Sequence, residues 1–203
     1  MKSAILAIFL LVFSIAPIHA KTIVVLGDSL SAGYGIDEKK GWVNLLNKEL
    51  QNNHYPYQIV NMSTSGDTTS NGLAKLPQVL QTYRPAFVLL QLGANDGLRG
   101  LSLTQMKSNL AQLIEISQKA NAKVLLIATL LPPNYGPVYL EKFKQVYRDL
   151  AKQYKIPLIP MFLEGVAGNP VFMQKDGLHP NQQAQSKILA NIWTTLMPML
   201  DKE

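Results

Sequence analysis

Short runs of continuously apolar, β-branched residues recur along the chain, and they constrain the fold more than any other feature. Four of them lie at residues 22–26, 58–60, 87–92 and 124–128, and a short fifth lies at residues 157–160. Continuous apolarity, without alternating polar residues, is typical of strands that are buried on both faces of a parallel sheet. The sequence therefore predicts a central, mostly parallel sheet of five strands.

Helical patterns fill the intervals between these runs. In four stretches, apolar residues recur every three or four positions, which is the period of a helix that buries one side. The stretches contain Trp42, Leu45 and Leu46; Leu103, Met106, Leu110, Leu113 and Ile114; Phe143, Val146, Tyr147, Leu150 and Tyr154; and Ala184, Ile188, Ile192 and Leu196. Strands that alternate with helices favour the α/β class, a three-layer α/β/α sandwich with helices on both faces of the sheet.

The first twenty residues differ from the rest of the chain. Lys2 supplies a positive charge, residues 4–15 form an apolar run, Pro17 interrupts it, and Ala20 offers a small residue for cleavage. This pattern predicts a signal peptide over residues 1–20 and one folded domain over residues 21–203. The apolar run is shorter than the roughly 20 residues that cross a bilayer, so we expect a secreted protein with no stable membrane anchor after leader removal.

The composition excludes several classes of function. The formal net charge is +6, but the basic residues are scattered and Lys39–Lys40 is the only adjacent pair. Such a distribution is typical of a solvated surface, so we expect no nucleic-acid partner. Cysteine is absent, which excludes a thiol nucleophile, disulfides and thiolate metal sites. With only two histidines after the leader, we expect neither a metal nor another cofactor.

Small, polar, glycine-rich segments follow the first three predicted strands, and a further polar segment lies near the carboxyl terminus. They are residues 27–35 (GDSLSAGYG), 61–67 (NMSTSGD), 93–97 (GANDG) and 176–180 (DGLHP). In open α/β sheets, ligands bind outside the carboxyl ends of the strands. We therefore expect the functional site at this edge of the sheet.

Elimination singles out one histidine. His19 falls within the leader, and His54 lies in a polar segment that we interpret as a surface loop, which leaves His179. Its imidazole can take a proton from a hydroxyl and return it to a leaving group. Asp176 is close enough to accept a hydrogen bond from the other ring nitrogen, and Pro180 fits the first turn of the last helix. The alternative is a helix-entry loop with an aspartate turn and an incidental histidine.

Ser29 directly follows the first predicted strand, where a nucleophile is expected. A serine hydroxyl needs an adjacent base because it is a poor nucleophile at neutral pH. The surrounding Gly-x-Ser-x-Ser departs from the Gly-x-Ser-x-Gly elbow of the α/β-hydrolases, which indicates a different architecture. We interpret the neighbouring Asp28, and Asp96 in the third segment, as acceptors that stabilise turns.

Taken in order, the four segments resemble the four signature blocks of the SGNH/GDSL hydrolases and span nearly the whole chain after the leader. Residues 92–100 (LGANDGLRG) and 131–136 (LPPNYG) resemble in particular the periplasmic subgroup of multifunctional acyl-CoA thioesterases, lysophospholipases and arylesterases. The resemblance implies a flavodoxin-like α/β/α fold and a periplasmic, cofactor-independent serine hydrolase. Its partner would be a small-molecule acyl ester or thioester, and we expect a monomer.

The resemblance also implies individual roles. Ser29 would be the nucleophile, His179 the general base and then acid, and Asp176 the carboxylate that orients the imidazole. The backbone N–H groups of Ser29 and Gly66, with the side-chain amide of Asn95, would form the oxyanion hole. A carbohydrate O-acetyl esterase of the same fold and a non-catalytic lipid-binding module are the alternatives.

Two predicted loops, residues 130–137 and 161–173, are rich in apolar side chains. These side chains could line an acyl groove, or they could serve ordinary loop packing, and the sequence does not separate the two interpretations. They are Leu131, Pro132, Pro133, Phe162, Leu163, Val166, Phe172 and Met173.

Overall fold

A computed structural model describes residues 20–201, so the predicted signal peptide lies, except for Ala20, outside the described residues. Five strands form one parallel sheet in the order β2-β1-β3-β4-β5. They are β1 (Lys21–Gly27), β2 (Tyr57–Asn61), β3 (Phe87–Gln91), β4 (Lys123–Ile127) and β5 (Leu158–Ile159). The five predicted strands are thus confirmed.

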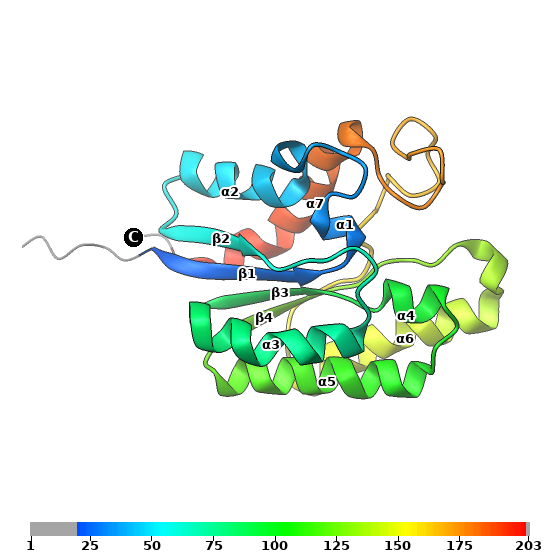
Figure 1. Cartoon of the computed structure of the whole chain (residues 1–203), viewed down its shortest axis with the longest axis horizontal. Helices are drawn as coiled ribbons and strands as arrows, with labels where there is room; N and C mark the ends of the chain where they lie inside the picture. The colour runs from blue at the N-terminus through cyan, green and yellow to red at the C-terminus, as the bar shows by residue number, and fades with distance from the viewer. Residues whose placement is uncertain (1–19, 202–203) are drawn as a thin grey trace, which may run out of the picture.

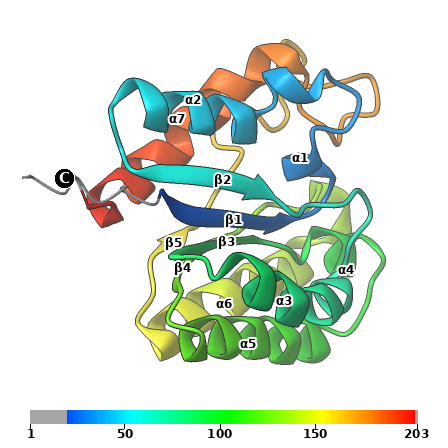
Figure 2. The ribbon, with the colours of Figure 1, turned by 60° about the vertical axis from the view of Figure 1, so that its left-hand side comes forward.

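Helices cover both faces of this sheet (Figure 1). On one face lie α1 (Ser29–Ala32), α2 (Trp42–Asn52) and α7 (Gln185–Leu196). On the other face lie α3 (Thr69–Tyr83), α4 (Ala94–Leu98), α5 (Leu103–Lys119) and α6 (Pro137–Tyr154). The turned view in Figure 2 shows the same three layers, which confirms the predicted α/β/α sandwich.

Alternate side chains of each strand enter two separate cores. In β3, Phe87 and Leu89 pack with the α2 and α7 side, whereas Val88 and Leu90 pack with the α3, α5 and α6 side. All four are buried. Because successive strand residues point to opposite faces, a sheet covered on both sides needs apolar residues at every position. This double burial explains the continuously apolar runs.

Three α-helices of the described residues lie outside the four predicted stretches: the short α1 and α4, and the 15-residue α3. The apolar pattern of α3 is interrupted by Gly72 and Pro77, two residues that are unfavourable in a helix interior. The helix begins with a capping box, in which the Thr68 hydroxyl accepts from the Asn71 backbone N–H and the Asn71 side chain accepts from the Thr68 N–H. Burial of one face against the sheet, including Leu76, outweighs the weak local propensity.

The entry to the last helix differs from the prediction. Pro180 does not lie in its first turn; it forms an isolated antiparallel bridge with Met173. Asn181 instead caps a short 3₁₀ turn (Gln182–Ala184) that leads into α7, because its side chain accepts from the next backbone N–H groups. With this side-chain acceptor at the cap, the helical segment starts at Gln182, two residues after Pro180, and α7 itself starts at Gln185.

The strand order creates one switch point in the sheet. The chain moves from β1 to its neighbour β2 on one side and then returns to β3 on the other side. At such a point the connections diverge and leave a crevice at the carboxyl ends of the two central strands, here β1 and β3. No helix within residues 20–201 is both long and apolar enough to cross a membrane.

Candidate active site

Ser29 is the first residue of α1 and lies at the carboxyl end of β1. The buried Asp28 caps this short helix, because its Oδ1 accepts from the Leu30 backbone N–H at 3.0 Å. Gln91, at the end of β3, donates to the same oxygen at 3.1 Å and accepts from the Ser31 hydroxyl at 2.6 Å. These contacts fix the turn that carries Ser29, and they confirm Asp28 as a turn-stabilising acceptor.

Asp28 is a fully buried carboxyl group directly before the serine. Burial raises its pKa to about 6, although hydrogen bonds from the Leu30 N–H and from Gln91 act in the opposite direction. Its second oxygen, Oδ2, has no hydrogen-bond partner within the described residues. Ionisation of this group therefore opposes folding near neutral pH.

His179 lies in the segment between β5 and α7 and contacts both predicted partners. Its Nδ1 is 2.7 Å from Asp176 Oδ2, and its Nε2 is 3.0 Å from Ser29 Oγ. The fold thus brings together three side chains that the sequence singled out, two of them 150 positions apart. The His179 side chain is 21% exposed, which leaves access for a small molecule while limiting contact with water.

Asp176 is held in its charged form. Desolvation acts against ionisation, but hydrogen bonds from the His179 backbone and ring and from the Leu178 N–H outweigh it and lower the Asp176 pKa to about 2. A carboxylate can only accept, so a neutral imidazole must carry its proton on Nδ1. The Nε2 of His179 is then free to accept the Ser29 hydroxyl proton.

Each of the three predicted oxyanion-hole residues has an N–H group that makes no hydrogen bond within the described residues. No hydrogen bond within residues 20–201 uses the backbone N–H of Ser29 or Gly66. Gly66 has a φ of +85°, a conformation that glycine adopts without strain. Asn95 follows β3; its side-chain amide donates to the Asp67 carbonyl at 2.9 Å, which leaves one N–H unused. Ser29 and Asn95 line the same cavity.

Arg99 and Asp96, which both follow β3 in the chain, fix the loop that contains Gly66. Arg99, which the sequence analysis did not assign a role, donates to the Gly66 carbonyl at 3.0 Å. Asp96 accepts from the backbone N–H and the hydroxyl of Thr69 at 2.9 and 2.6 Å. Asp96 therefore ties α4 to the start of α3, a longer-range contact than the local turn we expected.

An apolar cavity of about 160 Å³ borders Ser29 and His179. Of the residues predicted for an acyl groove, Leu131 and Leu163 line it, whereas Phe162 and Val166 are buried in the core and serve packing. Four further leucines, to which the sequence analysis assigned no place in a groove, also line it: Leu30, Leu98, Leu130 and Leu178. Pro132, Pro133, Phe172 and Met173 do not line it.

A larger hollow, of about 670 Å³, lies at the opposite end of the sheet around Lys123 and Pro157. Its described lining contains neither a histidine nor a serine. Chemistry rather than volume therefore locates the site at the β1 and β3 switch point. Within residues 20–201, no group of three or more acidic or histidine side chains is arranged to hold a metal ion.

The sequence matches the GDSL-like lipase/acylhydrolase family over residues 25–187. It is 50% identical to the esterase TesA of Pseudomonas aeruginosa over 181 residues, which cover 89% of this chain and 90% of that protein. It is 41% identical to thioesterase 1/protease 1/lysophospholipase L1 of Escherichia coli K12, covering 97% and 93% of the two chains. An arylesterase of Vibrio mimicus is 44% identical, covering 82% of this chain and 83% of that protein.

Solved structures agree with these relatives. A crystal structure of TesA superposes with a TM-score of 0.87 at 49% identity and covers 89% of this chain and all of that one. The psychrotrophic esterase EstA from Pseudoalteromonas, inhibited by monoethylphosphonate, superposes with a TM-score of 0.84 at 38% identity, covering 88% and 98%. The chain therefore belongs to the GDSL-like lipase/acylhydrolase family and is an ester-hydrolysing enzyme.

Proposed function

We propose that the protein is an exported serine esterase and thioesterase that hydrolyses acyl esters and thioesters through an acyl-serine intermediate. The observation that carries this proposal is the pair of contacts made by one imidazole, to Asp176 on one side and to the Ser29 hydroxyl on the other. The names of the relatives, which include esterase, thioesterase, lysophospholipase and arylesterase, support the same range of substrates.

The reaction proceeds in two steps. Ser29 Oγ attacks the carbonyl carbon while its proton passes to Nε2 of His179. The resulting oxyanion is stabilised by the N–H groups of Ser29, Gly66 and Asn95. The bond from carbon to the leaving oxygen or sulfur then breaks, and Nε2 delivers its proton to the leaving alcohol or thiol. Water, deprotonated by the same nitrogen, attacks the acyl-serine, and the proton returns to Ser29 as the acid departs.

Substitution of the nucleophile tests this mechanism. Ser29→Ala removes the attacking oxygen, so hydrolysis of p-nitrophenyl esters should fall by about 1000-fold or more, and labelling by a fluorophosphonate should disappear. Ser186→Ala is the matched control, because Ser186 is exposed on α7, lies outside the four segments and does not line the cavity beside Ser29. Retained turnover or labelling in Ser29→Ala would falsify the proposal. Asp176→Ala should keep a reduced, measurable rate.

The cavity beside Ser29 limits the acyl group. About 160 Å³ is small compared with ligand pockets of roughly 300–1,000 Å³, so we propose that it holds part of an acyl chain while the leaving group stays outside. Each methylene buried there contributes about 0.8 kcal/mol, or about a fourfold gain in kcat/KM. A series of esters from acetyl to palmitoyl should rise by this factor and then level off. A flat or acetyl-only profile contradicts the acyl cavity.

The same panel separates the alternatives. Efficient deacetylation of acetylxylan or peptidoglycan, with no gain from longer acyl chains, would indicate a carbohydrate O-acetyl esterase. A non-catalytic lipid-binding module would bind acyl compounds but would leave Ser29 unlabelled by the fluorophosphonate. An acyl-CoA and a lysophospholipid in the panel would compare thioester and oxygen-ester leaving groups directly.

We further propose that residues 1–20 direct export to the periplasm and that the mature domain, residues 21–203, acts as a monomer. The charged, apolar and small-residue regions of the leader support export. Cell fractionation followed by amino-terminal sequencing should recover a periplasmic protein that begins at Lys21. A cytoplasmic product that retains Met1 would contradict export, and a dimer mass by light scattering would contradict the monomer.

A further inference from the structure

The loop that carries the histidine is fastened to the serine segment by more than the Nε2–Oγ contact. The side-chain amide of Gln174 donates to the Tyr34 carbonyl at 2.7 Å and to the Pro180 carbonyl at 3.0 Å. The backbone N–H of Gln174 donates to the His179 carbonyl at 2.8 Å. One residue thus binds both sides of the site.

Tyr34 continues this connection to the nucleophile. Its backbone N–H donates to the Ser29 carbonyl at 3.1 Å, just past the left-handed residue that ends α1. A path of three hydrogen bonds therefore joins the backbone of Ser29, through Tyr34 and Gln174, to the backbone of His179. Because it ends on the backbone carbonyls of Ser29 and His179, this path fixes the separation of the two residues independently of their own side chains.

Gly35 is the residue that lets Gln174 come so close. Its φ is +75°, and a Cβ at this position would lie 2.3 Å from Gln174 Oε1 and 2.9 Å from Nε2. Any larger residue would push the amide away from the Tyr34 carbonyl. The close approach and the left-handed conformation both require glycine here.

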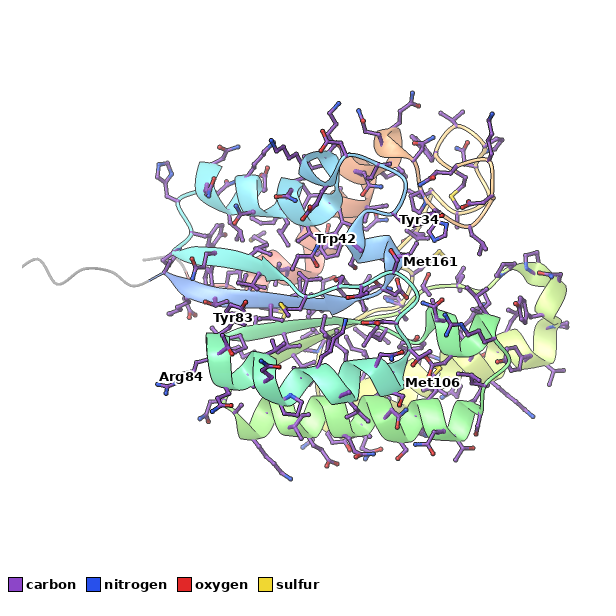
Figure 3. All side chains as sticks on the ribbon, viewed as in Figure 1. Tyr34, Trp42, Tyr83, Arg84, Met106 and Met161 are labelled. Atoms are coloured by element: carbon purple, nitrogen blue, oxygen red, sulfur yellow. The ribbon has the colours of Figure 1, made fainter. Side chains whose placement is uncertain are left out.

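The Tyr34 ring adds a contact to the imidazole itself. Its centroid lies 4.6 Å from that of the His179 ring, with 41° between the planes. Tyr34 as a whole residue is 52% exposed, and its hydroxyl makes no hydrogen bond within the described residues. Figure 3 labels Tyr34 at the end of the molecule toward which β1 points. An aromatic ring in contact with imidazole stabilises the positive charge that the imidazole gains during the reaction.

We propose that Gln174 and Tyr34 are positioning residues of the hydrolase. Gln174 sets the distance between Ser29 and His179, and the Tyr34 ring orients the imidazole and stabilises its protonated form. This inference rests on the proposed acyl-serine mechanism. It assigns a function to two residues that neither bond to the substrate nor transfer a proton in that mechanism.

Gln174→Met tests the inference, because methionine keeps the length of the side chain and removes both donors. A displaced base should lower kcat by about 10- to 100-fold with little change in KM. The loss should be larger for an alkyl ester than for a p-nitrophenyl ester, because a poor leaving group depends more on protonation by His179. Gln183→Ala is the matched control; Gln183 is exposed, and its side chain makes no hydrogen bond within residues 20–201.

Two further substitutions test the path and the ring separately. Gly35→Ala should reproduce the Gln174→Met phenotype, and the double variant should be no slower than the more impaired single variant, because both break one connection. Tyr34→Phe should retain the activity, whereas Tyr34→Leu should lose part of it, since only the ring contacts the imidazole.

Rates are expressed per reactive serine, counted by fluorophosphonate labelling to completion, so that unfolded protein does not contribute. Additive losses, an equal loss for both esters, or a Gln174→Met kcat within about twofold of the Gln183→Ala value would overturn the inference. Ser29→Ala separates the two proposals. If it stays active, the proposed function fails; if it is inactive while Gln174→Met is fully active, only the positioning role fails.

Discussion

The buried Asp28 makes a quantitative prediction about stability. Its pKa rises from 3.8 in the ordinary state to about 6 in the folded protein because burial disfavours the charged form. The folded state therefore binds more protons than the unfolded state between these values, and stability falls as the pH rises through this window. One pKa unit corresponds to about 1.4 kcal/mol, so the cost at pH 7 is roughly 3 kcal/mol.

Asp28→Asn removes this pH-dependent cost. The amide keeps an oxygen that can accept from Leu30 and Gln91, but it does not ionise. Relative to wild type, the free energy of unfolding of the variant should therefore increase by roughly 2 to 3 kcal/mol between pH 4 and pH 7. Contributions from other groups, including the low pKa of Asp176, are common to both proteins and cancel.

Urea unfolding, followed by tryptophan fluorescence at four pH values from 4 to 7, measures this difference. The value at pH 4, where folded Asp28 is neutral, is an internal control because it reports only how the amide fits the site. The sign of the difference in free energy of unfolding, and its dependence on pH from 4 to 7, then test the reasoning. A difference between variant and wild type that stays constant across this range, or that moves against the variant, would refute the burial of a carboxyl group at this turn.

Three further predictions follow from contacts of the site and core. Asn95→Ala should lower kcat by about 100- to 1000-fold with little effect on KM, and steady-state kinetics showing less than about a tenfold loss would exclude it from the oxyanion hole. Leu98→Phe, which adds volume at the cavity wall, should shift the acyl-chain plateau to shorter esters; an unchanged profile would contradict this. Gly93→Ala should destabilise the fold by roughly 2 to 4 kcal/mol, since φ is +113° and the new Cβ would lie 2.3 Å from Tyr147 Oη. Gly168→Ala, with φ +77° and no atom within 4 Å, is its thermal-melt control, and equal melting temperatures would rule out the clash.

The sequence predicted those features that follow from the chemical type of the residues and their order in the chain. Double burial leaves a continuous apolar run in a central strand, as in Phe87 to Leu90, so the sheet could be predicted without any tertiary information. The candidate site could be predicted from the sequence because few side chains can act as a base near neutral pH, and elimination left His179. Its contacts to Asp176 and Ser29 followed from chemistry that requires them.

Features that depend on tertiary contact were not predictable in this way. Helix α3 contains Pro77, and only its packing against the sheet offsets that local penalty. Gln174 and Tyr34 carry no reactive group, and they meet across 140 positions only because the fold brings two loops together. The leucines around the cavity, such as Leu98 and Leu178, resemble any other apolar residues until the neighbouring loops are placed.

The residues of the proposed mechanism differ in how well the fold anchors them. Ser29 and Asn95 follow β1 and β3, neighbouring strands at the centre of the sheet. His179 follows β5, a two-residue strand at the sheet edge. The segment that carries it, residues 160–181, consists of turns and contains a single isolated bridge. Segments with little regular structure open at lower free energy than central strands. On warming, His179, the proposed base, should therefore leave its position before Ser29, the proposed nucleophile, and inactivation should precede the melting of the sheet.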